Sequence, residues 1–411
     1  MFWAARCVHF DTDHLASRSI ERPRIGLGVP SLTTRDGGGF LTPPRGRKAS
    51  CLRLILCAGF GVKLMIAGAP TPASWANVPA RSGDAAALGI PSPLDAVSYV
   101  PGGGLRIGTT GLTIGGFTNV KAETTEEAGG EFALDNLNFF LIYDHFTRFR
   151  AVAELQLRDI FEASEEQVGT QNFAFDVRRL FGDFTVSDAL HVRAGTFLTP
   201  VGYWNLILAP PLTWTTEAPL IVEETFFQPT TTGVMLHGST GAGSGQLGYS
   251  LFSQFLQPLE NNPDPDLEPP DYTAGLRLTY DTGPAWSVGL SYQAAETNGR
   301  RSYLGGAHLL WQHRRGEILS EVYIQDGDAL RSAQWGTYLQ GVLQIHGPFY
   351  LVGRYEYFDP PAPDLTLNLF TLGGVFKPFP FMALKVEYRF VDRNPEEDNP
   401  QGFFSSFTTF F

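Results

Sequence analysis

The stretch "LKVEYRF", residues 384–390, alternates apolar and charged residues without interruption. In a β-strand, successive side chains point to opposite faces, so Leu384, Val386, Tyr388 and Phe390 share one face, and the charged residues share the other. A soluble sheet would pack the apolar face on a core. A membrane barrel would turn it to lipid and the charged face to a wet interior. This strand alone leaves both structures open.

The composition favours β-structure with many turns. The chain has 411 residues, of which 45 are Gly, 13% are aromatic and only 18% are charged. No apolar run is long enough for a transmembrane helix. All three cysteines lie in the first 57 residues, so no disulfide framework or thiolate metal site is expected after them.

The N-terminal region has the order of a secretory signal. The sequence has a basic patch near residues 45–48, an apolar stretch from Leu52 to Ala69, and small residues ending at Ala76. We therefore expect a signal peptide at 47–76, preceded by a mis-annotated or disordered extension at 1–46. A buried hydrophobic helix is the alternative. The net charge of −12, which becomes more negative without this segment, argues against a nucleic-acid partner.

The remaining chain repeats the opening pattern. From Leu105 onward, about 16 strand-like segments of about ten residues follow one another, which is near the length of a tilted membrane strand. Connections alternate between short ones, such as 281–284, and long ones, such as 122–131, 162–171 and 258–271. That alternation is typical of outer-membrane barrels. We predict an all-β transmembrane antiparallel barrel at 104–411, preceded by a periplasmic segment at 77–103. A soluble β-sandwich is the alternative.

The C-terminus "GFFSSFTTFF" predicts the strand that closes the barrel, with Phe403, Phe407 and Phe411 on one face. We assign fourteen charged residues to the inward faces of the predicted strands. These predicted pore-lining residues are Arg148, Arg150, Glu154, Arg158, Asp176, Arg178, Arg193, Arg277, Glu321, Arg354, Glu356, Lys385, Glu387 and Arg389. Rings of charge can set ion preference; alternatively, the charges pair across strands and only hold the wall.

The chain resembles Gram-negative porins, most closely the phosphate-selective porin O/P-like family, over residues 104–411. The resemblance rests on "GTFLTPVGYWN" (195–205), "PLTWTTEAPLIVEE" (211–224), "TTGVMLHG" (231–238) and "LGGVFKPFPFMALKVEYRF" (372–390). It implies a 16-stranded channel, often trimeric, that passes small solutes and in some members anions. Residues 200–229 contain no Lys or Arg, so a cationic phosphate site on that segment is not expected.

Residues 200–229 form the longest predicted connection, and the resemblance implies that this third outer loop folds into the lumen. Its apolar residues could pack on the inner wall, or could form an exposed adhesive patch. We predict a constriction in which acids of this loop face Arg148, Arg150 or Arg193. The predicted constriction residues are Tyr203, Trp204, Trp214, Glu217, Glu223 and Glu224.

No catalytic motif is present: the sequence lacks HExxH, a phosphate-binding loop and GxSxG. We therefore predict no enzyme activity, no cofactor and no metal site, although the acidic stretch 260–271 could hold a divalent ion. The predicted function is passive diffusion of small hydrophilic solutes and ions, with anions such as phosphate as candidates, across the Gram-negative outer membrane. Expected partners are outer-membrane lipid, lipopolysaccharide and two further copies of the chain. A non-conducting structural or adhesive barrel is the alternative.

Overall fold

The computed structural model describes residues 97–411 apart from gaps at 126–128, 147, 165–167, 171–172, 224–225, 258, 260–268, 284, 329, 331, 360–365 and 393–400. The predicted extension 1–46, the predicted signal peptide 47–76 and most of the predicted segment 77–103 lie outside the described residues. Most of the acidic stretch 260–271 also lies outside them.

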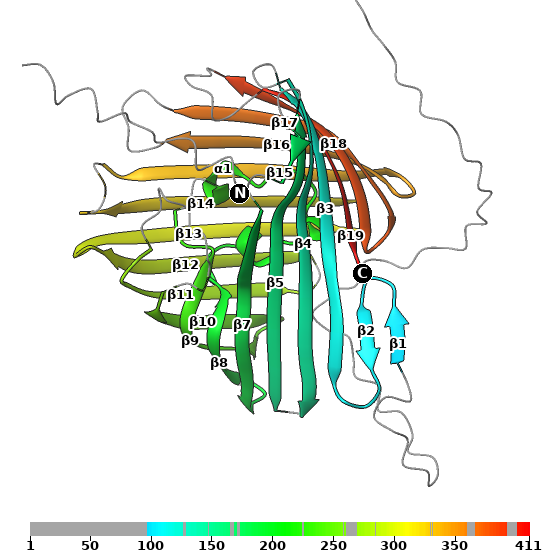
Figure 1. The fold of residues 1–411 in the computed structure, drawn as a ribbon. Helices are drawn as coiled ribbons and strands as arrows, with labels where there is room; N and C mark the ends of the chain where they lie inside the picture. Colours follow the sequence, from blue (N-terminus) through cyan, green and yellow to red (C-terminus); the bar gives the residue numbers. More distant parts are fainter. Residues whose placement is uncertain are drawn as a thin grey trace, which may run out of the picture. The chain divides into compact units, whose positions relative to one another are not determined.

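Sixteen antiparallel strands of the described residues form a closed barrel (Figure 1). In chain order they are β3 (Leu112–Thr125), β4 (Gly129–Phe146), β5 (Phe149–Ser164), β7 (Ala174–Ser187), β8 (Leu190–Leu198), β9 (Thr230–Ala242), β10 (Gly245–Leu256), β11 (Tyr272–Thr282), β12 (Trp286–Thr297), β13 (Arg300–His313), β14 (Gly316–Gly327), β15 (Gln334–His346), β16 (Phe349–Asp359), β17 (Leu367–Phe379), β18 (Met382–Asp392) and β19 (Gly402–Phe410). The predicted fold class is confirmed.

The C-terminal strand closes the barrel against the first barrel strand. β19 pairs with β3 from Gly402 opposite Thr125 to Phe410 opposite Phe117. Beyond that ladder, Phe411 exchanges two backbone hydrogen bonds with Gly116, at 3.0 and 2.9 Å. Because β19 pairs with β3, none of the sixteen barrel strands has an open edge in the described part of the chain.

Three shorter strands lie outside the barrel ladder. β1 (Val97–Val100) and β2 (Gly104–Ile107) form a hairpin whose second strand pairs with the first residues of β3. β6 (Val168–Gly169) adds two residues beside the far end of β5. The barrel strands therefore begin at Leu112, and Leu105 belongs to the hairpin.

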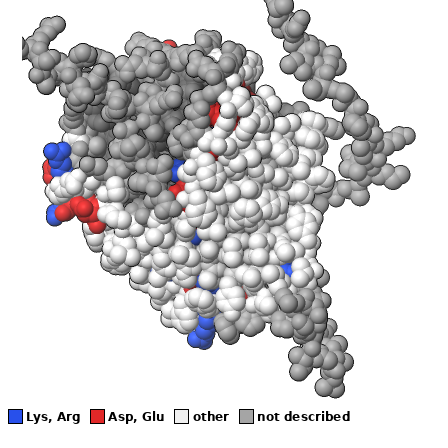
Figure 2. All heavy atoms as spheres, viewed as in Figure 1, with Lys and Arg blue, Asp and Glu red and all other residues white. Residues whose placement is uncertain are grey.

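The two faces of β18 answer the question raised by residues 384–390. Leu384, Val386 and Phe390 are 45%, 49% and 47% exposed on the outer face, whereas Lys385, Glu387 and Arg389 are almost fully buried. The outer face over β3, β4, β5 and β7 shows few charged side chains (Figure 2). The alternation therefore describes an apolar exterior and a charged interior.

The two ends of the barrel have different connections. At one end, here called the turn end, every connection has two or three residues, such as 347–348 and 380–381. At the opposite end, the loop end, the connections are mostly longer. The prediction of long loops at 122–131 and 162–171 is partly wrong, because β3, β4 and β5 continue into these stretches. Acidic residues there still fit extended strands, whose ends project from the barrel.

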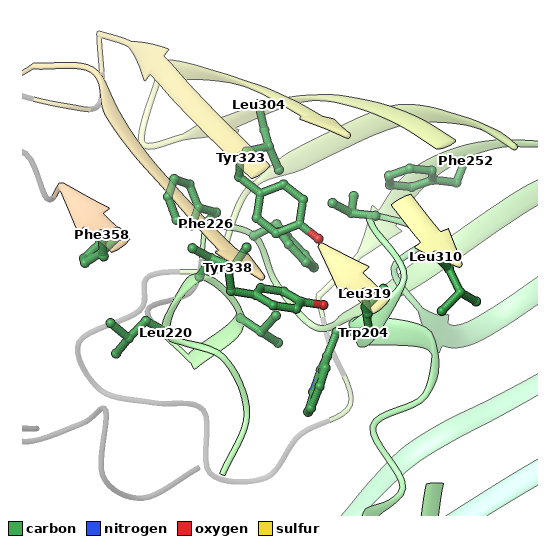
Figure 3. Close-up of a cluster of buried hydrophobic side chains, with 14 of the residues drawn as sticks. Trp204, Leu220, Phe226, Phe252, Leu304, Leu310, Leu319, Tyr323, Tyr338 and Phe358 are labelled. Atoms are coloured by element: carbon green, nitrogen blue, oxygen red, sulfur yellow. The ribbon is translucent and has the colours of Figure 1, made fainter. Parts of the chain in front are cut away.

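The connection between β8 and β9, residues 199–229, folds into the barrel and is called the inner loop below. It contains two short 3₁₀ helices, η3 (Trp204–Leu206) and η4 (Pro210–Leu212), and one turn of helix, α1 (Leu220–Glu223). Figure 3 shows its residues Trp204, Leu220 and Phe226 around Tyr323 and Tyr338 of the wall. None of the helices in the described part of the chain could span a bilayer.

Candidate functional site: a constriction beside the inner loop

The inner loop begins its crossing of the barrel at Glu321 of β14. This buried carboxylate accepts hydrogen bonds from the backbone N–H groups of Trp204 (2.7 Å) and Tyr203 (3.2 Å). The hydroxyls of Tyr338 (2.9 Å) and Tyr323 also donate to it. A buried carboxylate is costly unless its oxygens are paired. Glu321 therefore serves as the docking point for the first turn of the loop.

Gly202 allows the backbone to approach this docking point closely. Its φ is +65°, and an added Cβ would overlap the Tyr323 hydroxyl and the Glu321 carboxylate. Its N–H donates to Ser291 Oγ at 3.1 Å. Only glycine combines this left-handed conformation with the absence of a side chain.

The second anchor is the pair Arg354 and Glu356 on β16. Arg354 is completely buried and donates to Thr215 Oγ1 (2.6 Å), to the carbonyl of Glu217 (2.9 Å) and to the carbonyl of Ala218 (3.1 Å). Glu356 accepts from the N–H of Leu220 at 2.6 Å. These contacts hold the polar backbone of residues 215–220.

The third anchor is on β18. The Lys385 ammonium donates to the carbonyls of Pro210 (2.8 Å) and Thr215 (2.9 Å) and to Thr213 Oγ1 (2.8 Å). Glu387 accepts from the N–H of Thr216 at 3.1 Å. Five predicted pore-lining residues on β14, β16 and β18 thus lie on the inner face but beneath the loop, where they bind loop backbone instead of lining open space: Glu321, Arg354, Glu356, Lys385 and Glu387.

Glu217 of the inner loop faces Lys121 of β3. Its carboxylate lies 3.1 Å from the Lys121 ammonium. Burial alone would raise the pKa of Glu217, but Lys121 and Arg389 outweigh burial and lower this pKa to about 2. The predicted pairing of Glu217 with Arg148, Arg150 or Arg193 is therefore not seen.

The opposite side of the barrel, formed by β4, β5, β7 and β8, leaves a cavity of about 390 Å³ beside the inner loop. Its charged lining is strongly basic. Four arginines and one glutamate reach it: Arg150, Arg178, Arg179, Arg193 and Glu154. This constriction cavity is the candidate functional site.

A β-bulge brings two consecutive arginines to the cavity. The register between β5 and β7 shifts after Glu154, so that Glu154 pairs with Arg179 and Leu155 pairs with Val177. A bulge leaves one residue unpaired and re-aims its side chain. Arg179 Nε donates to Glu154, and Arg178 donates to Gln156 at 3.2 Å. Strict alternation would turn Arg179 outward, so the sequence pattern does not predict its place at the cavity.

A row of charges crosses the strands below the bulge. Asp183 lies opposite Arg150 on one side and opposite Arg193 on the other. Arg193 donates to Asp183 at 2.6 Å and lies over the ring of Phe181 at 4.2 Å. Among the described residues, Arg150 has no ion-pair partner. In this row, the Arg193 guanidinium is therefore ion-paired, and the Arg150 guanidinium has no ion-pair partner among the described residues.

The rest of the cavity wall is apolar. The inner loop contributes Leu206, Leu208, Ala209 and Leu212. The barrel contributes four phenylalanines and three aliphatic residues: Phe117, Phe140, Phe181, Phe410, Ile142, Val152 and Leu198. A second cavity of about 240 Å³ shares Arg179, Phe181, Arg193, Leu198 and Leu206 with the first. Arg179 and Arg193 therefore lie where the two cavities adjoin.

The remaining predicted site residues are scattered. Arg148 is exposed in the turn before β5, and Arg158 pairs with Asp176 at 2.6 Å. Arg277 lies on β11, and Arg389 lies over the ring of Phe404 at 4.9 Å. Trp214 Nε1 donates to Glu317 at 2.8 Å, and Tyr203 packs near His308. The side chain of Glu223 and all of Glu224 lie outside the described residues.

The aromatic residues of the closing strand divide between the two faces. Phe403 and Phe407 are exposed on the outer face, whereas Phe404 is buried inside. Phe411 packs against Phe139 with ring centroids 5.9 Å apart. Within the described residues, no group of three or more His, Cys, Asp or Glu side chains is placed to hold a metal ion.

The barrel is similar to several solved structures. OmpF of Salmonella typhi has a TM-score of 0.51 and 12% identity, covering 75% of this chain and 98% of that chain. An anion-selective porin from Comamonas acidovorans has a TM-score of 0.50 and 14% identity, covering 73% and 99%. A trimer form of the Vibrio cholerae outer membrane protein OmpT has a TM-score of 0.50 and 9% identity, covering 73% and 99%.

Sequence comparison adds nothing to this likeness. No protein-family model matches the chain. No curated protein has a matching sequence. At identities this low, structural likeness carries information about the fold and not about a solute. We conclude that the chain has the fold of a porin barrel with its third loop-end connection folded inside.

Proposed function

We propose that this protein is a porin of the Gram-negative outer membrane, a channel through which small hydrophilic solutes and ions diffuse passively. One observation carries the proposal: a closed 16-strand barrel with an apolar exterior retains cavities beside an inward-folded loop. A barrel made only for structure or adhesion has no need of a basic cavity beside an inward-folded loop. The rival function, a non-conducting or adhesive barrel, would require the loop to seal the lumen.

The proposed channel prefers anions. Four arginines against one glutamate in the cavity lining support this preference, because charged rings set ion selectivity in wide pores. Of the nearby acids, Asp183 pairs with Arg193, and Glu321, Glu356 and Glu387 bind the backbone of the inner loop on other strands. The inner loop offers no Lys or Arg for phosphate. We therefore propose general anion preference rather than a phosphate-specific site.

Planar-bilayer recording of refolded protein tests this function. We expect stable ohmic conductance steps and, in a salt gradient, a reversal potential with the sign of an anion-preferring pore. Silent membranes, with protein that is folded by gel shift, would favour the non-conducting rival. A cation-preferring reversal potential would keep the channel and reject the charge argument.

We further propose a trimer in outer-membrane lipid, in contact with lipopolysaccharide, reached after secretion with the signal peptide at 47–76. The trimer form of the similar OmpT structure supports the assembly. Cross-linking in native membranes should give a three-chain species. Mass spectrometry of the purified protein should find an N-terminus near Asn77, and peptides from residues 1–46 would contradict the proposed processing.

A further inference from the structure

We propose that the constriction cavity is a binding site for small organic carboxylates with an apolar body, such as an aromatic acid, rather than for inorganic anions. The inference rests on the proposed channel function and names the class of solute that the channel holds. Two kinds of wall, one of arginines and one of apolar side chains, meet in this cavity.

The charged wall supplies guanidinium donors for a carboxylate. Arg179 and Arg193 each use one carboxylate partner, Glu154 and Asp183 respectively. A guanidinium has five N–H donors in a planar fork, so one partner leaves further donors. Arg150, across from Asp183, adds a guanidinium with no ion-pair partner among the described residues. A carboxylate matches the bidentate geometry of such forks.

The apolar wall cannot serve a hydrated inorganic ion. Leu206, Leu208 and Leu212 of the inner loop line the same cavity as the arginines with hydrocarbon. Phosphate, which accepts hydrogen bonds in all directions, would lose water there and gain no donor. The apolar body of an organic acid would instead remove hydrocarbon from water on both the ligand and the wall.

Aromatic side chains near the arginines extend the apolar wall. Phe181 lies under Arg193 at 4.2 Å, and Phe140 lies under Arg179 at 5.2 Å. These contacts fix the guanidinium planes against rings, which orients the donors and leaves ring edges for a ligand. A ligand with a carboxylate at one end and a ring or chain at the other fits both walls at once.

The cavity has the size of a small-ligand site. Its volume of about 390 Å³ lies at the low end of the range of roughly 300–1,000 Å³ for ligand pockets. The adjoining cavity of about 240 Å³ shares Arg179 and Arg193, so a carboxylate could pass from one cavity to the other while keeping an arginine partner. Such a site binds solutes transiently, as a channel requires.

Current block in planar bilayers at low salt tests the inference, with benzoate, acetate, phosphate and neutral benzyl alcohol as probes. We expect benzoate to half-block the current at a concentration about tenfold below that of acetate or phosphate, because the ring adds apolar burial. Benzyl alcohol should block far less than benzoate. Equal half-blocking concentrations for benzoate, acetate and phosphate would overturn the proposal, and so would equal block by benzyl alcohol and benzoate.

Two variants and one control distinguish the contributions of the arginine wall and the apolar wall to block. Arg150→Gln should weaken block by benzoate and acetate by similar factors, because it removes one guanidinium and leaves no partner orphaned. Leu206→Asn should reduce the preference for benzoate over acetate. Arg301→Gln, at an exposed ion pair with Glu296, is the matched control and should leave every half-blocking concentration unchanged. If Arg150→Gln behaves like the control, the proposed site is wrong.

Equilibrium dialysis of labelled benzoate with folded, detergent-solubilised protein distinguishes this inference from the channel proposal. Silent membranes together with saturable benzoate binding, weakened in Arg150→Gln, would reject the channel and keep the site. Normal conductance without saturable binding or block would keep the channel and reject the site.

Discussion

Arg354 and Glu356, two residues apart on the inner face of β16, pair at 2.7 Å and bind the inner loop from the same strand. Arg354 donates to loop carbonyls, and Glu356 accepts from the N–H of Leu220. Both side chains are buried. The pair therefore makes the hydrogen bonds that water would otherwise make to a stretch of irregular backbone inside the barrel. Without such partners, this backbone could not be buried without losing its hydrogen bonds.

Breaking this pair from one side should be more damaging than removing it. Arg354→Met leaves Glu356 buried beside loop carbonyls that have lost their donor, a change that costs about 3–5 kcal/mol for buried pairs. The double variant Arg354→Met with Glu356→Leu removes the isolated charge. We expect the single variant to lose its heat-resistant gel form at a lower temperature than the double variant. The reverse order would show that Glu356 stabilises the protein through the Leu220 N–H even without Arg354.

A side chain at position 202 should displace the start of the inner loop. Gly202→Ala introduces a Cβ against the Tyr323 hydroxyl at a positive φ, a strain of about 1–3 kcal/mol. We expect noisier single-channel currents and a lower unfolding temperature in the gel assay. Gly341→Ala, where a Cβ meets nothing within 4 Å, is the control. Identical behaviour of the two variants would mean that the loop does not need this close approach.

Acid should remove the contribution of the Glu217 carboxylate to the stability of the folded protein only at low pH. Its unfolded-state pKa is near 4.5 and its folded-state pKa is about 2, so its ionised form stabilises the protein fully above about pH 4.5, and the stabilisation is lost as the pH falls to about 2. We expect wild type to exceed Glu217→Gln in unfolding temperature at pH 7 and the difference to vanish near pH 2. Lys121 keeps Asp135 at 3.5 Å in this variant. A difference that is independent of pH would argue against the ion pair.

Removing the inner loop should widen the channel. Excision of residues 206–222 deletes η4, the part of the constriction cavity's apolar wall that the inner loop supplies, and the loop residues that cover Lys385. We expect single-channel conductance to rise several-fold, as a larger cross-section of the barrel opens, in protein that still shows the gel shift. Unchanged conductance in folded protein would place the narrowest point elsewhere.

The closed barrel should resist sodium dodecyl sulphate until it is heated. All strand edges of the barrel are paired, including the ladder of β19 with β3, so local opening exposes backbone groups that lipid or detergent cannot satisfy. Unheated and boiled samples should therefore run at different gel positions. Deleting Phe403–Phe411 should abolish the difference. One position for native protein before and after boiling would contradict a stable barrel.

Residue patterning along the chain is enough to predict the fold class and the faces of the strands. Alternation such as that of Leu384 to Phe390 is a local property, because every second side chain of a strand shares a face whatever the partner strand. The length and apolar content of residues 200–229, together with the porin resemblance, also predicted that this connection lies inside. Strand ends near 122–131 were misjudged, because polar residues suit both an exposed loop and a strand end that projects from the barrel.

Tertiary structure alone decided which inward charges remain open to a cavity. Lys385 and Arg150 have the same inward placement by alternation, yet the inner loop crosses over Lys385 and leaves Arg150 beside the cavity. Arg179 reaches the cavity through a bulge that depends on its pairing with β5. The path of a loop and a register shift both depend on contacts between residues far apart in sequence. The alternation of residues within one strand gives no information about such contacts.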